Sequence, residues 1–132
     1  MTNNMIVDSF ELAAGRCGDL TPLVYARLFG EHPELEQFFV MDPTGAVRGS
    51  MLAWVISAIL DYAGDRSFGE NLIRAEAVNH TGMGVAPEQF GLFFGAVADT
   101  LRELLGADWT PAMDQAWGML LGEMAGLVQR AG

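Results

Sequence analysis

Apolar residues recur at intervals of three and four along most of this chain, and this spacing constrains its fold more than any other feature. The clearest run comprises Phe90, Phe93, Phe94, Val97, Leu101 and Leu104. Side chains spaced in this way lie on one face of an α-helix. Gly106 ends the pattern, and Thr110–Pro111 then supplies the N-cap and the first-position proline that open a helix. The sequence predicts one helix over residues 88–105 and a second long helix after Pro111.

The earlier part of the chain follows the same pattern. Thr21–Pro22 is predicted to cap a helix that ends at Gly30, and a short segment over residues 33–39 follows it. The turn at residues 42–45 precedes a helix that ends at Gly64. Two shorter stripes complete the set: Ile6, Phe10, Ala13 and Cys17, and then Ile73, Ala77 and His80.

The predicted fold class is all-α, with six to seven helices. No segment shows sustained alternation of apolar and polar residues between hairpin turns, so a sheet is not expected. The unequal helix lengths and the short segment after Pro33 argue against a plain four-helix bundle. With 132 residues, of which 51% are hydrophobic and 18% charged, the chain is expected to form a single domain over residues 1–132 with one core.

Charge excludes several classes of partner. The 17 acidic and 7 basic residues give a net charge of −10, and all the basic residues are arginine. Such a surface repels phosphate backbones and anionic lipids, so neither a nucleic acid nor a membrane is expected as partner. Met1–Asn4 contains no cationic residue before an apolar stretch, so we expect a cytoplasmic protein. The lone Cys17 excludes an internal disulfide and a cysteine-rich zinc site.

His80 is the residue most suited to bind a metal. The other histidine, His32, lies in a polar break between predicted helices and is interpreted as a solvated turn residue. His80 shares an inward helix face with Ile73 and Ala77, where an imidazole is by default a hydrogen-bonded core residue. No second histidine, cysteine or carboxylate cluster completes a tetrahedral site. A metal on His80 would therefore have to bring its own equatorial ligands, as iron does in haem.

The aromatic inventory is compatible with a cavity but does not require one. The 8 Phe, 3 Trp and 8 Met exceed what a small helical core needs, and they could line a pocket for a flat apolar ligand. Tyr25 lies on an inward face, where its hydroxyl needs a partner, either a backbone carbonyl or a bound ligand. There is no phosphate-binding glycine loop and no nucleophile elbow, so catalysis by side chains alone is not expected.

Two strings and the start of the last predicted helix carry a family resemblance. Residues 23–29 and 32–39 resemble the second and third helices of bacterial single-domain globins and of the globin domains of flavohaemoglobins. Residues 78–90 look like the proximal-histidine segment of these proteins and the helix that follows it. Asp108–Pro111 with Ala116–Trp117 looks like the opening of their last helix. The resemblance covers nearly the whole chain in order, and it implies a globin fold of six to seven helices around a haem b pocket.

The resemblance also implies roles for individual residues. His80 matches the proximal ligand of the haem iron, and Phe39 matches the aromatic residue that packs on the porphyrin. Tyr25 matches the distal tyrosine that donates a hydrogen bond to the gas ligand. With Tyr62 aligned to a tyrosine common near the end of the distal helix, Met51 takes the place of the distal glutamine or histidine. Val55 then takes the apolar position one turn further on.

The chain departs from the flavohaemoglobin pattern at Phe90, which stands where that family has a tyrosine. The partner glutamate of that tyrosine is also not found, so we expect reversible binding of dioxygen, carbon monoxide or nitric oxide. Nitric-oxide dioxygenation with a separate reductase stays open. The oligomeric state also stays open, as either a monomer or a homodimer. A second hypothesis is a haem-free globin fold that binds a protein partner. A third is a haem iron whose sixth position is closed by Met51.

Overall fold

The computed structural model describes residues 4–131, the last of these by its backbone alone, and it is all-α over this range. Its elements are α1 (Met5–Arg16), α2 (Thr21–Glu31), the 3-10 helix η1 (Pro33–Phe39), α3 (Ala46–Ala63), α4 (Gly69–Gly82), α5 (Pro87–Leu105), the 3-10 helix η2 (Gly106–Asp108) and α6 (Pro111–Ala131). The predicted fold class is confirmed, and the short segment expected over residues 33–39 is η1.

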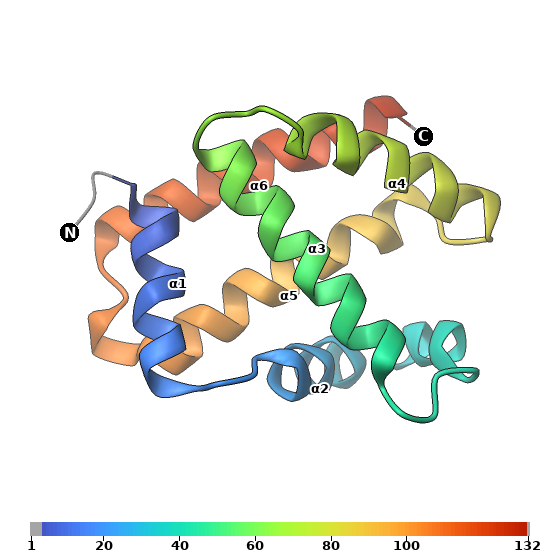
Figure 1. Cartoon of the computed structure of the whole chain (residues 1–132), viewed down its shortest axis with the longest axis horizontal. Helices are drawn as coiled ribbons and strands as arrows, with labels where there is room; N and C mark the ends of the chain where they lie inside the picture. Colours follow the sequence, from blue (N-terminus) through green and yellow to red (C-terminus); the bar gives the residue numbers. More distant parts are fainter. Residues whose placement is uncertain (1–3, 132) are drawn as a thin grey trace.

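The helices cross one another instead of running side by side as in a simple bundle (Figure 1). In that view α3 passes in front of α5, while α2 and η1 lie along the lower edge. The most extensive packing joins α5 to α6, α2 to α5, α3 to α4, and α4 to α6. The N-terminal helix α1 packs against α5 and α6 at the end of the molecule away from η1.

The core follows the predicted stripes of α5 and α6. Phe93, Phe94, Val97 and Leu101 of α5 are buried, as are the α6 residues Met113, Trp117, Leu120, Met124, Leu127 and Val128. The indole nitrogen of Trp117 donates a hydrogen bond to Ser9 Oγ at 3.0 Å, and that hydroxyl donates to the carbonyl oxygen of Ile6 at 2.7 Å. These buried polar atoms between α1 and α6 are thus paired, which removes the cost of burying them.

Several predicted helix ends are confirmed and others need correction. Thr110 Oγ1 accepts a hydrogen bond from the backbone nitrogen of Met113 at 3.1 Å, which confirms this cap. Thr21 is instead the first residue of α2, and its backbone nitrogen donates to Asp19 Oδ1 at 3.0 Å. The Thr21 side chain therefore does not cap α2 as predicted, and Asp19 pairs with one of the free amides at the start of the helix instead. The end of α2 lies at Glu31, one residue beyond Gly30. Cys17 follows the end of α1.

Gly69 sets how closely α4 approaches α3. A Cβ atom at this position would lie 2.5 Å from the carbonyl oxygen of Ala58 in α3, closer than such atoms can be. The glycine therefore allows the start of α4 to pack directly on the α3 backbone.

Among the described helices, α3 is the one long and apolar enough to cross a membrane, judged by length and composition alone. Its mean hydropathy is 1.2 over residues 46–63. A helix that packs in a protein core passes the same test, and Val55 and Ile59 of α3 are buried in the core.

Candidate functional site

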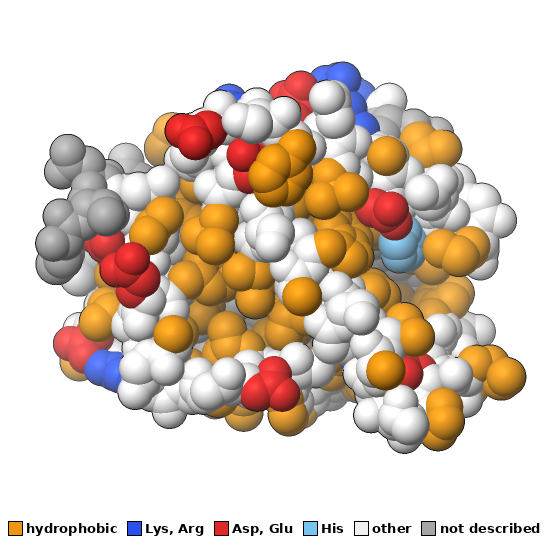
Figure 2. Space-filling view, viewed as in Figure 1, with side chains coloured by type: hydrophobic (Ala, Val, Ile, Leu, Met, Phe, Trp, Pro, Cys, Tyr) orange, Lys and Arg blue, Asp and Glu red, His pale blue; other side chains and the backbone are white. Residues whose placement is uncertain are grey.

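An apolar pocket of about 390 Å³ lies between α3, α4, α5 and η1. This volume is within the roughly 300–1,000 Å³ of pockets that hold small molecules and cofactors. Its lining is aromatic or aliphatic except for Glu76, His80 and Gln89. In the space-filling view a histidine beside a carboxylate borders a hollow with many hydrophobic side chains around it (Figure 2). The pocket is suited to a ligand that is largely apolar and has one group for an imidazole to bind.

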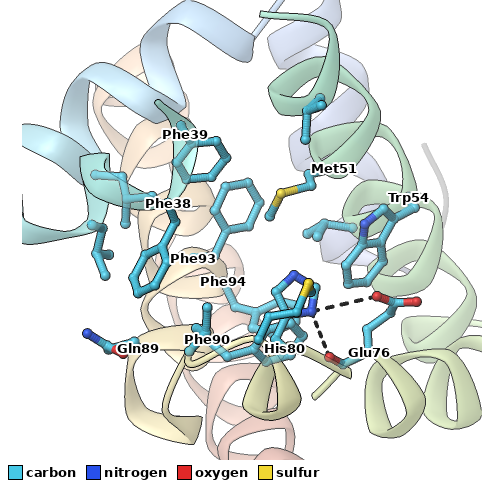
Figure 3. A pocket seen from close by; sticks show the side chains of 16 residues that line it. Phe38, Phe39, Met51, Trp54, Glu76, His80, Gln89, Phe90, Phe93 and Phe94 are labelled. Carbon is cyan, nitrogen blue, oxygen red and sulfur yellow. Dashed lines mark hydrogen bonds and ion pairs between the residues drawn. The ribbon is translucent and has the colours of Figure 1, made fainter. Parts of the chain in front are cut away.

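His80 lies in the last turns of α4 and presents one ring nitrogen to this pocket. Its Nδ1 is 2.7 Å from the carbonyl oxygen of Glu76, one helical turn earlier. Because a carbonyl oxygen only accepts hydrogen bonds, Nδ1 carries a proton, and in the neutral form of the ring Nε2 then carries the lone pair. Figure 3 shows the second ring nitrogen directed away from Glu76, toward the side chains of the pocket. This tautomer and this orientation are those of a histidine that binds a metal through Nε2.

A metal bound by His80 would need its other ligands from outside the protein. Within residues 4–131 no group of three or more histidine, cysteine, aspartate or glutamate side chains could hold a metal ion. The pocket walls around His80 are instead aromatic: Phe90 lies with its ring centroid 4.8 Å from that of the imidazole. Trp54 stacks on Phe90 with a centroid distance of 6.4 Å and an interplanar angle of 20°. An iron porphyrin fits this donor set, because it brings four nitrogen ligands and a flat apolar ring.

The wall opposite His80 is formed by η1, α3 and α5. Phe39 comes from η1, Met51 and Val55 come from α3, and Phe93 comes from α5. The Met51 sulfur points into the pocket in Figure 3. The described lining residues on this side are all apolar, so this wall offers a small ligand an apolar environment.

Tyr25 lies behind this wall and is not among the described residues that line the pocket. Its ring centroid is 5.4 Å from that of Phe39 and 5.4 Å from that of Phe93. Its hydroxyl donates to the carbonyl oxygen of Arg48 at 3.1 Å, so it has the backbone partner that the sequence allowed. Burial raises the pKa of the phenol, so the hydroxyl keeps its proton. A direct hydrogen bond from Tyr25 to a ligand stays a prediction.

The structure brings together the other five residues predicted for the site. His80, Phe39, Met51, Val55 and Phe90 all line the same pocket, although they come from four different elements. Which of them contact a bound cofactor stays a prediction.

Sequence reasoning missed Trp54 and Glu76 as pocket residues. Trp54 follows Met51 by three positions and Glu76 precedes His80 by four, and helical periodicity places each on the same face as its neighbour. That spacing is the signal by which both could have been found.

The start of α3 is held by a buried carboxylate in the preceding turn. Asp42 accepts hydrogen bonds from the backbone nitrogens of Val47 and Arg48, each at 3.0 Å, and from Arg48 Nε at 3.2 Å. Burial by itself raises the pKa of Asp42, but these hydrogen bonds outweigh it and hold the pKa below its ordinary value. Asp42 therefore fixes the first turn of α3, the helix that carries Met51. It also fixes Arg48, whose carbonyl oxygen accepts the hydrogen bond from Tyr25.

Comparison with known proteins supports a family assignment. The Globin family model matches residues 23–127. A flavohemoprotein of Rhizobium meliloti (strain 1021) is 29% identical over 107 residues, which cover 79% of this chain and 26% of that protein. A flavohemoprotein of Bordetella pertussis (strain Tohama I) is 27% identical over 110 residues, or 83% of this chain and 27% of that protein.

These relatives are longer proteins, and the chain spans about a quarter of their length. No solved structure matches the chain closely enough for a comparison. The family match includes α3, α4, α5 and most of α2 and α6, and it therefore contains the whole pocket around His80. The chain belongs to the globin family.

Proposed function

We propose that this globin holds haem b in the pocket between α3, α4, α5 and η1 and reversibly binds a diatomic gas there. The observation that carries the proposal is the orientation of His80, whose Nε2 is directed into an apolar pocket while Nδ1 is held by the Glu76 carbonyl. Haem would supply the iron atom to which dioxygen, carbon monoxide or nitric oxide binds. The names of the similar flavohemoproteins are consistent with a haem group.

The protein side chains would have three tasks at this site. His80 would bind the iron, and the Glu76 carbonyl would keep its ring in one tautomer and one orientation. Phe39 and Phe90, which line the pocket, would contact the apolar ring. Met51 and Val55 would exclude water from the side where the gas enters, and exclusion of water slows oxidation of the iron.

We place reversible binding ahead of nitric-oxide dioxygenation because of what surrounds His80. Phe90, at 4.8 Å between ring centroids, presents no hydroxyl to the imidazole.

The haem-free interaction domain is supported by no specific contact in the described chain, and an absorption spectrum separates it from a haem protein.

The test is the absorption spectrum of the purified protein after addition of haemin. We expect a Soret band in the wild type and a shift of that band when carbon monoxide is added to the reduced protein. His80→Ala should abolish or strongly alter both features, because it removes the axial nitrogen. His32→Ala is the matched control, since it removes the other histidine, which does not line this pocket.

Two results would count against the proposal. A wild-type protein that stays colourless with haemin would exclude a haem function and favour the interaction domain. A His80→Ala variant with the wild-type spectrum would remove His80 from the iron.

A further inference from the structure

Glu76 approaches the imidazole of His80 with two different groups. Its carbonyl oxygen is 2.7 Å from Nδ1, and its carboxylate Oε2 is 3.6 Å from the same nitrogen. Both contacts are drawn in Figure 3, where they converge on the ring nitrogen that faces away from the pocket. The carbonyl contact requires only a helical backbone, whereas the carboxylate contact depends on the residue at position 76.

The carboxylate is placed where its charge acts on the imidazole with little screening. The side chain of Glu76 is 29% exposed and that of His80 is 14% exposed. Among the described residues that line the pocket, Glu76 is the only one with a carboxylate, and no arginine lines it. The negative charge of the Glu76 carboxylate lies 3.6 Å from Nδ1, at the edge of an apolar pocket. No described cation in the pocket lining offsets this charge.

A carboxylate beside the N–H of a metal-bound histidine changes the donor strength of the opposite nitrogen. It attracts the Nδ1 proton, so electron density at Nε2 rises and the histidine becomes a stronger ligand. A negative charge near a metal also favours the more highly charged oxidation state. Both effects stabilise ferric over ferrous iron.

We propose that Glu76 is a positioning residue that strengthens the bond of His80 to haem iron and lowers the reduction potential of the site. This inference rests on the proposed function, because it requires haem on His80. It differs from the role of the carbonyl, which any residue at position 76 would fulfil in a helix.

The test is the reduction potential of the haem-loaded protein with Glu76→Gln, which removes the charge and keeps the shape of the side chain. We expect the equilibrium constant for reduction to rise about tenfold, which for one electron is about 59 mV. We also expect the iron–histidine stretching band of the ferrous protein, measured by resonance Raman spectroscopy, to move to lower frequency. Glu76→Asp should retain part of the wild-type value.

Glu70→Gln is the matched control. Glu70 lies on the same helix and pairs with Arg74 at 3.9 Å, but it does not line the pocket. Its replacement removes the same charge and should leave both the potential and the stretching band unchanged.

The possible failures can be told apart. Equal potentials and equal stretching bands in wild type and Glu76→Gln, with haem bound in both, would overturn the role of Glu76 alone. An equal shift in Glu70→Gln would also overturn it, because the effect would then follow net charge. A wild type that takes up no haem would overturn the proposed function, and this inference with it.

Discussion

Tyr25 is a buried phenol whose single proton is donated to the carbonyl oxygen of Arg48. Its ring packs against Phe39 and Phe93, both of which line the pocket, so the side chain supports the pocket wall from behind. A hydrogen bond to a gas ligand would require the hydroxyl to turn away from Arg48. The hydroxyl proton of Tyr25 can thus bond either to the carbonyl oxygen of Arg48, which supports the fold, or to a gas ligand, but not to both at once.

Tyr25→Phe separates these two roles. We expect unfolding free energy to fall by about 1 kcal/mol, because one intramolecular hydrogen bond is lost. Urea denaturation would measure this loss. Tyr62→Phe is a suitable control, since the Tyr62 hydroxyl is 3.1 Å from Glu123 Oε1 and lies outside the pocket lining. Dioxygen dissociation that is several-fold faster in Tyr25→Phe alone would show that the hydroxyl reaches the ligand. Unchanged stability would contradict the structural role.

Two aspartates fix the helices that carry the pocket walls. Asp42 accepts the backbone amides of the first turn of α3. Asp61, in the last turn of α3, accepts the amides of Ser67, Phe68 and Gly69 at 2.6–3.1 Å and so joins this helix to the start of α4. Burial raises the pKa of Asp61, but these backbone hydrogen bonds outweigh it and lower the pKa. Met51 and His80 owe their relative placement partly to these two carboxylates.

Asp42→Asn should make the stability of the protein less dependent on pH in the acid range. The folded-state pKa of Asp42 is lowered from 3.8, so its stabilising effect is complete above that value and is lost as pH falls through the lower, folded-state pKa. We expect the variant to be clearly less stable than wild type at pH 6, with a gap that narrows toward pH 3. Chemical denaturation at both pH values would measure it.

The exposed residue Asp65 provides the control for this measurement. Asp65→Asn should have little effect at either pH. A gap between Asp42→Asn and wild type that stays constant from pH 6 to pH 3 would show that the charge of Asp42 does not stabilise the start of α3.

The pocket is a property of the whole molecule. The described residues that line it fall between Leu28 and Phe94, and none of the described side chains of α1 or α6 is among them. These two helices pack on α5, and α6 also packs on α4, while ion pairs of Arg16 with Asp108 and of Arg27 with Glu103 join distant parts of the chain. The helices that carry the pocket walls are thus packed against helices that do not line the pocket.

Haem binding should therefore stabilise the entire fold. A ligand at a free concentration of 100 times its dissociation constant adds about 2.7 kcal/mol to the unfolding free energy. We expect haemin to raise the midpoint temperature of thermal unfolding of the wild type. Circular dichroism at 222 nm, recorded during heating, would measure this midpoint. His80→Ala should lose most of this gain, while His32→Ala should keep it. Equal gains in all three proteins would indicate that haemin binds without the His80 nitrogen.

The sequence alone determined the helices, the bounds of several of them and the inward direction of His80, because helical periodicity and capping depend on residues three or four positions apart. The predicted helix over residues 88–105 is α5, and the short segment at residues 33–39 is η1. The resemblance supplied Phe39, Met51, Val55 and Phe90 as candidates. Only the tertiary structure decided that they share one pocket with His80 and that the hydroxyl of Tyr25 is bound to Arg48. Contacts between elements depend on how whole helices pack, and no local pattern records that packing.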